Sequence, residues 1–249
     1  MNRINIVIKR DYRELRHSAA FRIMIIVGAA VTVAAAVGIS IALNLQSWLG
    51  EPGARPVLEL FIGLVAFFLP FFMMIAFIWS FATLSVIKEK VNGNLESLMA
   101  TPLTPHELWL GKSFAIFLPA YVISIITVVI VALAINLAAI LPATGGFVFN
   151  VPALFLGLVV NPLLFFTMLL FIILFSIANN PDIAIAPSFL IGFGLMMGMP
   201  AGLGLGWFDI SSWPFTLWYL VGTLVLFVIV LCLTRMLKRQ NIVLSSKGS

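Results

Sequence analysis

The sequence contains few charged residues, and this scarcity excludes a water-soluble globule. Only 9% of its 249 residues are Asp, Glu, Lys or Arg, whereas 62% are hydrophobic. Such a chain has too little polar surface to cover a soluble domain, so lipid must be its main solvent. Cysteine is almost absent as well, and the single Cys232 permits no intrachain disulfide. The composition therefore predicts an integral membrane protein.

The apolar residues are gathered in runs long enough to cross a bilayer. A helix needs about 20 residues to span the hydrocarbon core. The uncharged run from 113 to 181 is too long for one span, so we divide it at the turn sequence Pro142-Ala-Thr-Gly-Gly. The chain then has six uncharged segments, each about 20 residues long or longer. These runs lack the period-two alternation of membrane strands, so they predict helices. We expect an all-α, polytopic protein with six transmembrane helices. The predicted spans are residues 23–45, 60–87, 113–141, 154–178, 183–205 and 215–234.

The basic residues are distributed unevenly between the two ends of these spans. Of the 14 Lys and Arg residues, only Arg55 falls on one side of a six-span arrangement. Loops rich in Lys and Arg stay in the cytoplasm. Both termini and the loop at 88–112 are therefore predicted to be cytoplasmic. The net charge of +5 follows from this orientation, and we expect no nucleic-acid partner.

The segment before the first span is not typical of a signal peptide, because Asp11 and Glu14 interrupt its basic region. Ile4, Ile8 and Tyr12 recur at helical spacing, with the basic side chains on other faces. This pattern predicts an amphipathic helix in the inner headgroup plane, acting as a membrane anchor, a partner-binding helix or both. We expect one transmembrane domain over 1–249. Its parts are the N-terminal elbow at 1–22, spans one and two at 23–87, the cytoplasmic loop at 88–112, spans three to six at 113–234 and the cytoplasmic tail at 235–249.

Motifs for catalysis or nucleotide binding are incomplete. Gly111-Lys112-Ser113 matches the end of a P-loop, but His106 stands where the first glycine is required. His106-Glu107 begins a zinc-protease motif, and Leu110 replaces its second histidine. We expect no catalytic residue and no metal site. Since the predicted spans also carry no ionisable coupling residue, energy for any uphill transport must enter from outside them.

The loop at 88–112 has the pattern of a structured element. Thr104-Pro105-His106-Glu107 is a capping box that opens a helix running into span three. Upstream, Leu95, Leu98 and Met99 have helical spacing. Two interpretations follow from these residues alone. The loop transmits force from a cytoplasmic partner into spans two and three, or it is a passive solvated connection.

The same loop resembles a known family. Its residues follow the pattern E-x-x-x-G-T-L-E-x-L-x-x-T-P-[LIV]-[ST]-x-x-E-x-x-x-G-K of type-2 ABC transporter permeases, and the basic N-terminal helix is similar to their elbow. The sequence departs from the pattern at Asn94, where Thr is usual, and at Met99, where Leu is common. The ATPase-coupling residues that the resemblance implies are Glu89, Gly93, Leu95, Glu96, Thr101, Pro102 and Glu107.

This resemblance implies the permease subunit of an ABC exporter in a prokaryotic plasma membrane. Such a subunit is not itself an enzyme and holds no cofactor, because ATP and Mg²⁺ bind to separate ABC ATPase subunits that dock on the loop. It pairs with a second permease copy or a paralogue within the membrane lipid. Two other classes remain open. One is an integral membrane enzyme using carboxylates or His106 near the interface, and the other is a structural membrane protein with no ATPase partner.

Two further patterns concern packing. Gly194, Gly198, Gly202 and Gly206 recur every four residues and predict a helix-packing seam, with a role in the transport path as the alternative. Trp109, like several other tryptophans, is close to a predicted span end, where an indole ring is expected to anchor at the interface.

Overall fold

The computed structural model describes residues 3–51, 53–82, 101–178 and 181–237, and all regular secondary structure within these ranges is helical. Among these described residues, five helical segments are long and apolar enough to cross a membrane. The prediction of an all-α protein with membrane-length apolar helices is therefore confirmed. The five segments are Ala19–Asn44, Ala54–Phe81, Pro105–Thr144, Val151–Ile177 and Trp213–Leu233.

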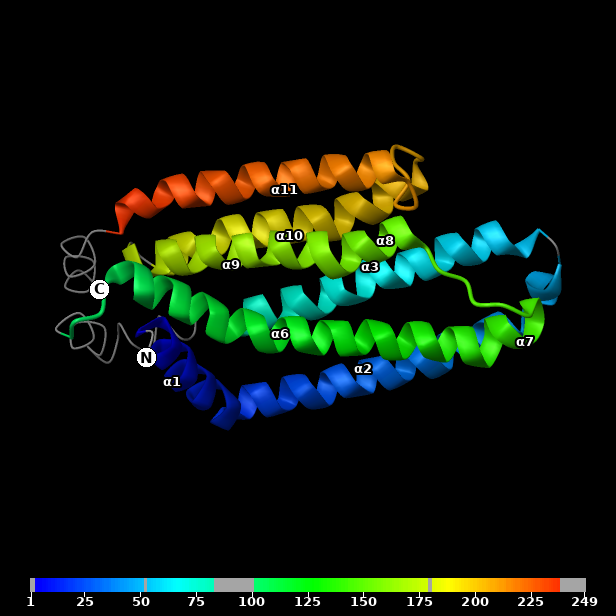
Figure 1. Cartoon of the computed structure of the whole chain (residues 1–249), viewed down its shortest axis with the longest axis horizontal. Helices are drawn as coiled ribbons and strands as arrows, with labels where there is room; N and C mark the ends of the chain where they lie inside the picture. Colours follow the sequence, from blue (N-terminus) through cyan, green and yellow to red (C-terminus); the bar gives the residue numbers. More distant parts are fainter. Residues whose placement is uncertain (1–2, 52, 83–100, 179–180, 238–249) are drawn as a thin grey trace.

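The N-terminal helix is separated from the first long helix by a break at Ser18. Helix α1 covers Arg3–His17 and α2 covers Ala19–Asn44. Ser18 has extended backbone, with φ −70° and ψ 141°, and its hydroxyl accepts a hydrogen bond from the Phe21 N–H at 3.1 Å. Helix α2 therefore begins before the predicted boundary at residue 22 between the N-terminal segment and the first span. The Ser18 cap, and not the point where the sequence becomes apolar, determines where the helix starts. Helix α1 consequently lies at an angle to α2 (Figure 1).

The short helix η1 (Ser47–Gly50) connects α2 to α3 (Ala54–Phe81), and α3 packs closely against α6 (Pro105–Ile135). Helix α6 continues through a π-helical segment η2 (Asn136–Ile140) and the short α7 (Leu141–Thr144).

The chain then reverses at Gly145, whose φ of 73° is left-handed and suits glycine. The predicted turn after Pro142 is thus confirmed. The returning segment is formed by α8 (Val151–Phe155), the π-helical η3 (Leu156–Val160) and α9 (Asn161–Ala178).

The chain is completed by α10 (Pro181–Gly204), α11 (Trp213–Leu233) and the short η4 (Thr234–Met236). Helices α2 and α11 lie at opposite edges of the bundle, with α3, α6 and α9 between them (Figure 1). Burial agrees with this arrangement, since 67% of an 18-residue stretch within Val151–Ile177 is buried but only 17% of such a stretch within Trp213–Leu233. Helix α1, the start of α6 and the end of α11 lie at one end, which we call the basic end, while η1 and α7 lie at the other.

Candidate functional site

Helix α1 crosses the beginning of α6 at very close range. Val7 is buried against this crossing, and a Cβ atom added to Gly111 would lie 2.6 Å from the Val7 Cγ1 atom. Only a glycine at position 111 permits the helices to approach in this way. The crossing is part of a larger contact between α1, residues 101–104 and the first turns of α6. We call this contact the elbow junction.

A buried ion pair holds the elbow junction together. The Lys112 Nζ atom lies 3.1 Å from the Asp11 Oδ2 atom, and the two side chains are only 1% and 9% exposed. The other carboxylate oxygen, Oδ1, is 2.7 Å from the Arg10 Nη2 atom. Buried charges require such partners, because breaking a buried pair typically costs about 3–5 kcal/mol. The pair thus fixes the position of α1 on α6.

The end of the loop is tied to the same helix. Arg3, in the first turn of α1, donates a hydrogen bond from Nη1 to the Pro102 carbonyl oxygen at 2.7 Å. Thr101 and Pro102 are both exposed at this point. The segment that leads from the loop into α6 is therefore attached to α1 as well as to its own helix.

The predicted capping box is confirmed. The Thr104 hydroxyl accepts a hydrogen bond from the Glu107 N–H at 3.2 Å, and the Glu107 carboxylate accepts one from the Thr104 N–H at 2.8 Å. These reciprocal bonds satisfy backbone donors that a helix leaves unpaired at its N-terminus. The start of α6 is consequently well defined where the loop joins it.

Trp109 connects the elbow junction to the centre of the bundle, and the prediction that it anchors at the interface is wrong. Its side chain is 2% exposed, and its indole N–H donates to the Leu170 carbonyl oxygen of α9 at 2.8 Å. The capping box starts α6 well before Ser113, so position 109 lies inside the helix packing and not at its edge.

The predicted coupling residues fall into two groups. Thr101, Pro102 and Glu107 are brought together in the elbow junction. The remaining ones lie outside the described residues: Glu89, Gly93, Leu95 and Glu96.

Sequence reasoning missed the partners Asp11 and Lys112, since it treated both residues as parts of charged flanking segments. One available signal was an acidic residue within a strongly basic helix, at a position that faces the neighbouring helix.

Within the described residues, the glycine ladder of α10 is not packed against another helix, so the helix-packing seam stays a prediction. Gly194 and Gly198 are exposed, and a Cβ added to either meets no described atom within 4 Å. Gly202 packs against the Phe208 ring, while Gly206 follows the helix with a φ of 71°. Among the glycines of α10, Gly192 packs closely on α3, since a Cβ added to it would lie 2.7 Å from the Ile75 Cδ1 atom.

Comparison of the chain with protein-family models, curated proteins and solved structures gives no match.

Proposed function

We propose that this chain is the membrane-spanning permease subunit of an ABC exporter, driven by separate ATPase subunits that dock on its loop between α3 and α6. The observation that supports this proposal most directly is the elbow junction. The resemblance assigns the loop to ATPase docking, and the end of the loop, α1 and α6 are held together by the Arg3 bond, the buried ion pair and the capping box.

This construction suits a force-transmitting element better than a passive connection. A load applied to the loop would reach α6 through Thr104 and α1 through Pro102. From α6 it would pass to α9 through Trp109. Because packed helices shift as units, a small displacement of the loop would move three helices of the bundle together.

The proposal includes six spans, with α10 as the sixth. Helix α10 has 24 residues, enough to cross the hydrocarbon core, and it packs along α9. The basic end would face the cytoplasm of a prokaryotic cell, placing both termini and the loop inside and Arg55 outside.

A second permease subunit would complete the assembly. Gly194 and Gly198 leave part of α10 without a neighbouring helix within the described chain, and small residues at four-residue spacing allow another helix to approach. ATP and Mg²⁺ would be held by the ATPase chains.

The central experiment is to coexpress the chain with its candidate ATPase, purify the complex and reconstitute it into liposomes. We expect two permease and two ATPase subunits and ATP-dependent transport. Glu96→Lys should reduce ATPase docking and coupled turnover at least tenfold, because it reverses a charge at the proposed contact. Glu51→Lys is the matched control, since it reverses an acidic charge at the opposite end and should leave docking unchanged. Gly93→Val should also disturb docking, because a β-branched residue resists turn geometry.

Two outcomes would contradict the proposal. Normal coupling in the Glu96→Lys variant would show that the loop is not the docking element. An active chain that neither binds nor requires an ATPase would favour the membrane-enzyme or structural interpretation.

A further inference from the structure

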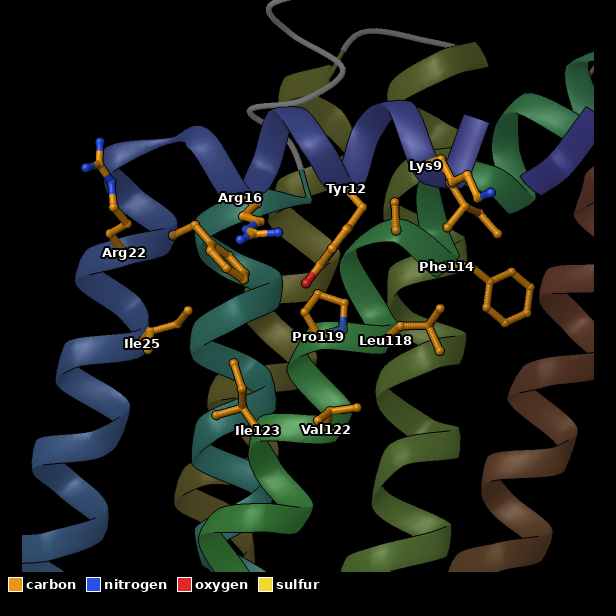
Figure 2. Close-up of a pocket in the computed structure, with 13 residues that line it drawn as sticks. Lys9, Tyr12, Arg16, Arg22, Ile25, Phe114, Leu118, Pro119, Val122 and Ile123 are labelled. Atoms are coloured by element: carbon orange, nitrogen blue, oxygen red, sulfur yellow. The ribbon is translucent and has the colours of Figure 1, made fainter. Parts of the chain in front are cut away.

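A groove between α1, α2 and α6 lies beside the elbow junction, and none of its 13 lining residues is one of the proposed coupling residues. Its volume is about 630 Å³, and Figure 2 shows the 13 side chains that line it. This volume falls within the range of about 300–1,000 Å³ that is typical of ligand sites. The groove is open to the outer surface of the bundle, because several of its lining residues are exposed.

The floor of the groove is apolar and faces the surroundings of the bundle. Ile25 of α2 and Leu118 and Val122 of α6 are 43%, 44% and 52% exposed. They belong to helices that are apolar and long enough to span the membrane, so this surface is suited to hydrocarbon. Pro119 also lines the groove, and α6 changes direction in this part of its length (Figure 1). A proline inside a helix is a common cause of such a bend.

The rim of the groove is cationic. Lys9 and Arg16 come from one face of α1 and Arg22 from the start of α2, and the Tyr12 side chain points from α1 toward Pro119 (Figure 2). None of the described lining residues is acidic. Within the part of the chain that the structure describes, these three cations also form no ion pair.

The two carboxylates of α1 do not line this rim. Asp11 is buried on another face of α1, where Arg10 and Lys112 bind both of its oxygens, and Glu14 is not among the residues that line the groove. The groove therefore combines an apolar floor with three basic side chains that are spread along its rim and form no ion pair within the described residues. A ligand that complements both parts needs an anionic head and a long apolar tail.

We propose that this groove binds an anionic phospholipid of the surrounding leaflet. An acyl chain would lie along Ile25, Leu118 and Val122. The phosphate would lie at the rim beside Arg16, which Figure 2 shows between Arg22 on one side and Lys9 on the other. Guanidinium groups bind phosphate oxygens in a bidentate manner, and lysine adds a point charge. Because α1 forms one wall, a bound lipid stabilises its position on α2 and α6. The lipid therefore acts as a structural effector of the elbow junction, whichever partner docks there.

The test is native mass spectrometry and thermal unfolding of the purified chain in detergent. Phosphatidylglycerol is compared with phosphatidylcholine of the same acyl chains and with free glycerol phosphate. We expect phosphatidylglycerol to bind at least tenfold more tightly than phosphatidylcholine and to raise the unfolding temperature. Glycerol phosphate should have little effect, because it has no tail for the apolar floor.

Two variants separate the head from the tail. Lys9→Gln/Arg16→Gln/Arg22→Gln should abolish the preference for the anionic lipid, since each basic residue near an anionic headgroup contributes about fivefold to binding. The triple variant Arg13→Gln/Arg55→Gln/Arg235→Gln removes the same charge away from the groove and should retain the preference. Val122→Trp should fill the channel and weaken both lipids, whereas Val129→Trp, on the same face of α6 outside the groove, should not.

Three results would overturn the proposal. They are equal binding of the two lipids to the unmodified chain, an equal loss of preference in both triple variants, and binding of glycerol phosphate as tight as that of phosphatidylglycerol. The last result would indicate a simple anion site. All these measurements are made without an ATPase, so they are independent of the proposed transport function.

Discussion

Asp11 links helix α1 to α6 through a buried ion pair. It is buried, and it accepts contacts from Lys112 of α6 and Arg10 of its own helix. Lysine is rarely buried without a partner because desolvation strongly disfavours an isolated charge. The close approach of Val7 to Gly111 brings the backbones near enough for this pair to form.

We expect Asp11→Asn to lower the free energy of unfolding by about 3 kcal/mol, because it removes the carboxylate that faces the buried Lys112 ammonium group. Lys112→Met should cost less, because Arg10 still pairs with the Asp11 carboxylate. The double variant Asp11→Leu/Lys112→Met should recover much of this loss, since no isolated buried charge remains at the pair. Thermal or denaturant unfolding in detergent measures the effect.

The exposed pair Arg55–Glu59 provides the control, with side chains 73% and 42% exposed. Arg55→Met should cost about 0–1 kcal/mol, because water solvates the remaining carboxylate. Additive losses in the Asp11/Lys112 double variant would contradict the role assigned to the pair.

At the scale of the helices, two prolines follow backbone carbonyl groups that accept hydrogen bonds from side chains of a neighbouring helix. Pro162 has no N–H to donate into the preceding π-helical segment η3, and there the Tyr121 hydroxyl of α6 donates to the Leu158 carbonyl oxygen at 3.2 Å. Pro142 likewise has no N–H to donate into η2, where the Ala138 carbonyl oxygen accepts from the Asn44 side chain of α2 at 3.1 Å. Backbone acceptors freed within one helix are thus satisfied by side chains of another, as an apolar environment requires.

Removing one of these donors should be costly only while the proline is present. Tyr121→Phe should lower the free energy of unfolding by about 1 kcal/mol, the usual size of such a hydrogen bond. In a Pro162→Ala background, residue 162 regains an N–H that can serve Leu158, so the cost of Tyr121→Phe should fall. A double-mutant cycle of unfolding free energies measures the difference. An unchanged cost would show that the proline does not create the need for Tyr121.

At the scale of the whole molecule, the long helices separate a basic end from an end where Arg55 lies. The basic end includes α1 and the start of α6 (Figure 1). Helices α2 and α11 form the edges, and their large apolar side chains are extensively exposed. This distribution matches a protein whose outer surface contacts lipid and whose two ends contact different compartments.

Cysteine labelling tests this orientation. In a Cys232→Ala background, which removes the exposed native thiol, Ser97→Cys and Ser246→Cys should resist an impermeant thiol reagent in whole cells, whereas Ser47→Cys should react. Ser47 is preferable to Gly145, because a side chain at a φ of 73° would be strained. Labelling of position 97 from outside would refute the six-span arrangement.

The exposed glycines of α10 lead to a prediction about assembly. Gly198→Leu should reduce permease dimerisation at least tenfold, because the added side chain occupies space proposed for a second helix. Gly38→Leu on α2 is a suitable control, since a Cβ there also meets no described atom within 4 Å. Gly28 is unsuitable, because it packs against Ile123 and Met73. Cross-linking and size measurement of the purified complex would compare them, and equal assembly of both variants would exclude Gly198 from the contact.

The sequence by itself determined the helical class, the apolar segments and the start of α6 at Thr104. Hydropathy, length and a capping box act within a few turns of one helix, so the printed residues are sufficient to predict them. Tertiary structure decided which residues from distant helices meet. The Asp11–Lys112 pair joins positions 101 residues apart, and Trp109 is buried because α9 covers it. The absence of a neighbour at Gly198 within the described chain is equally a result of packing. Such contacts depend on how helices are turned toward one another, which local periodicity does not specify.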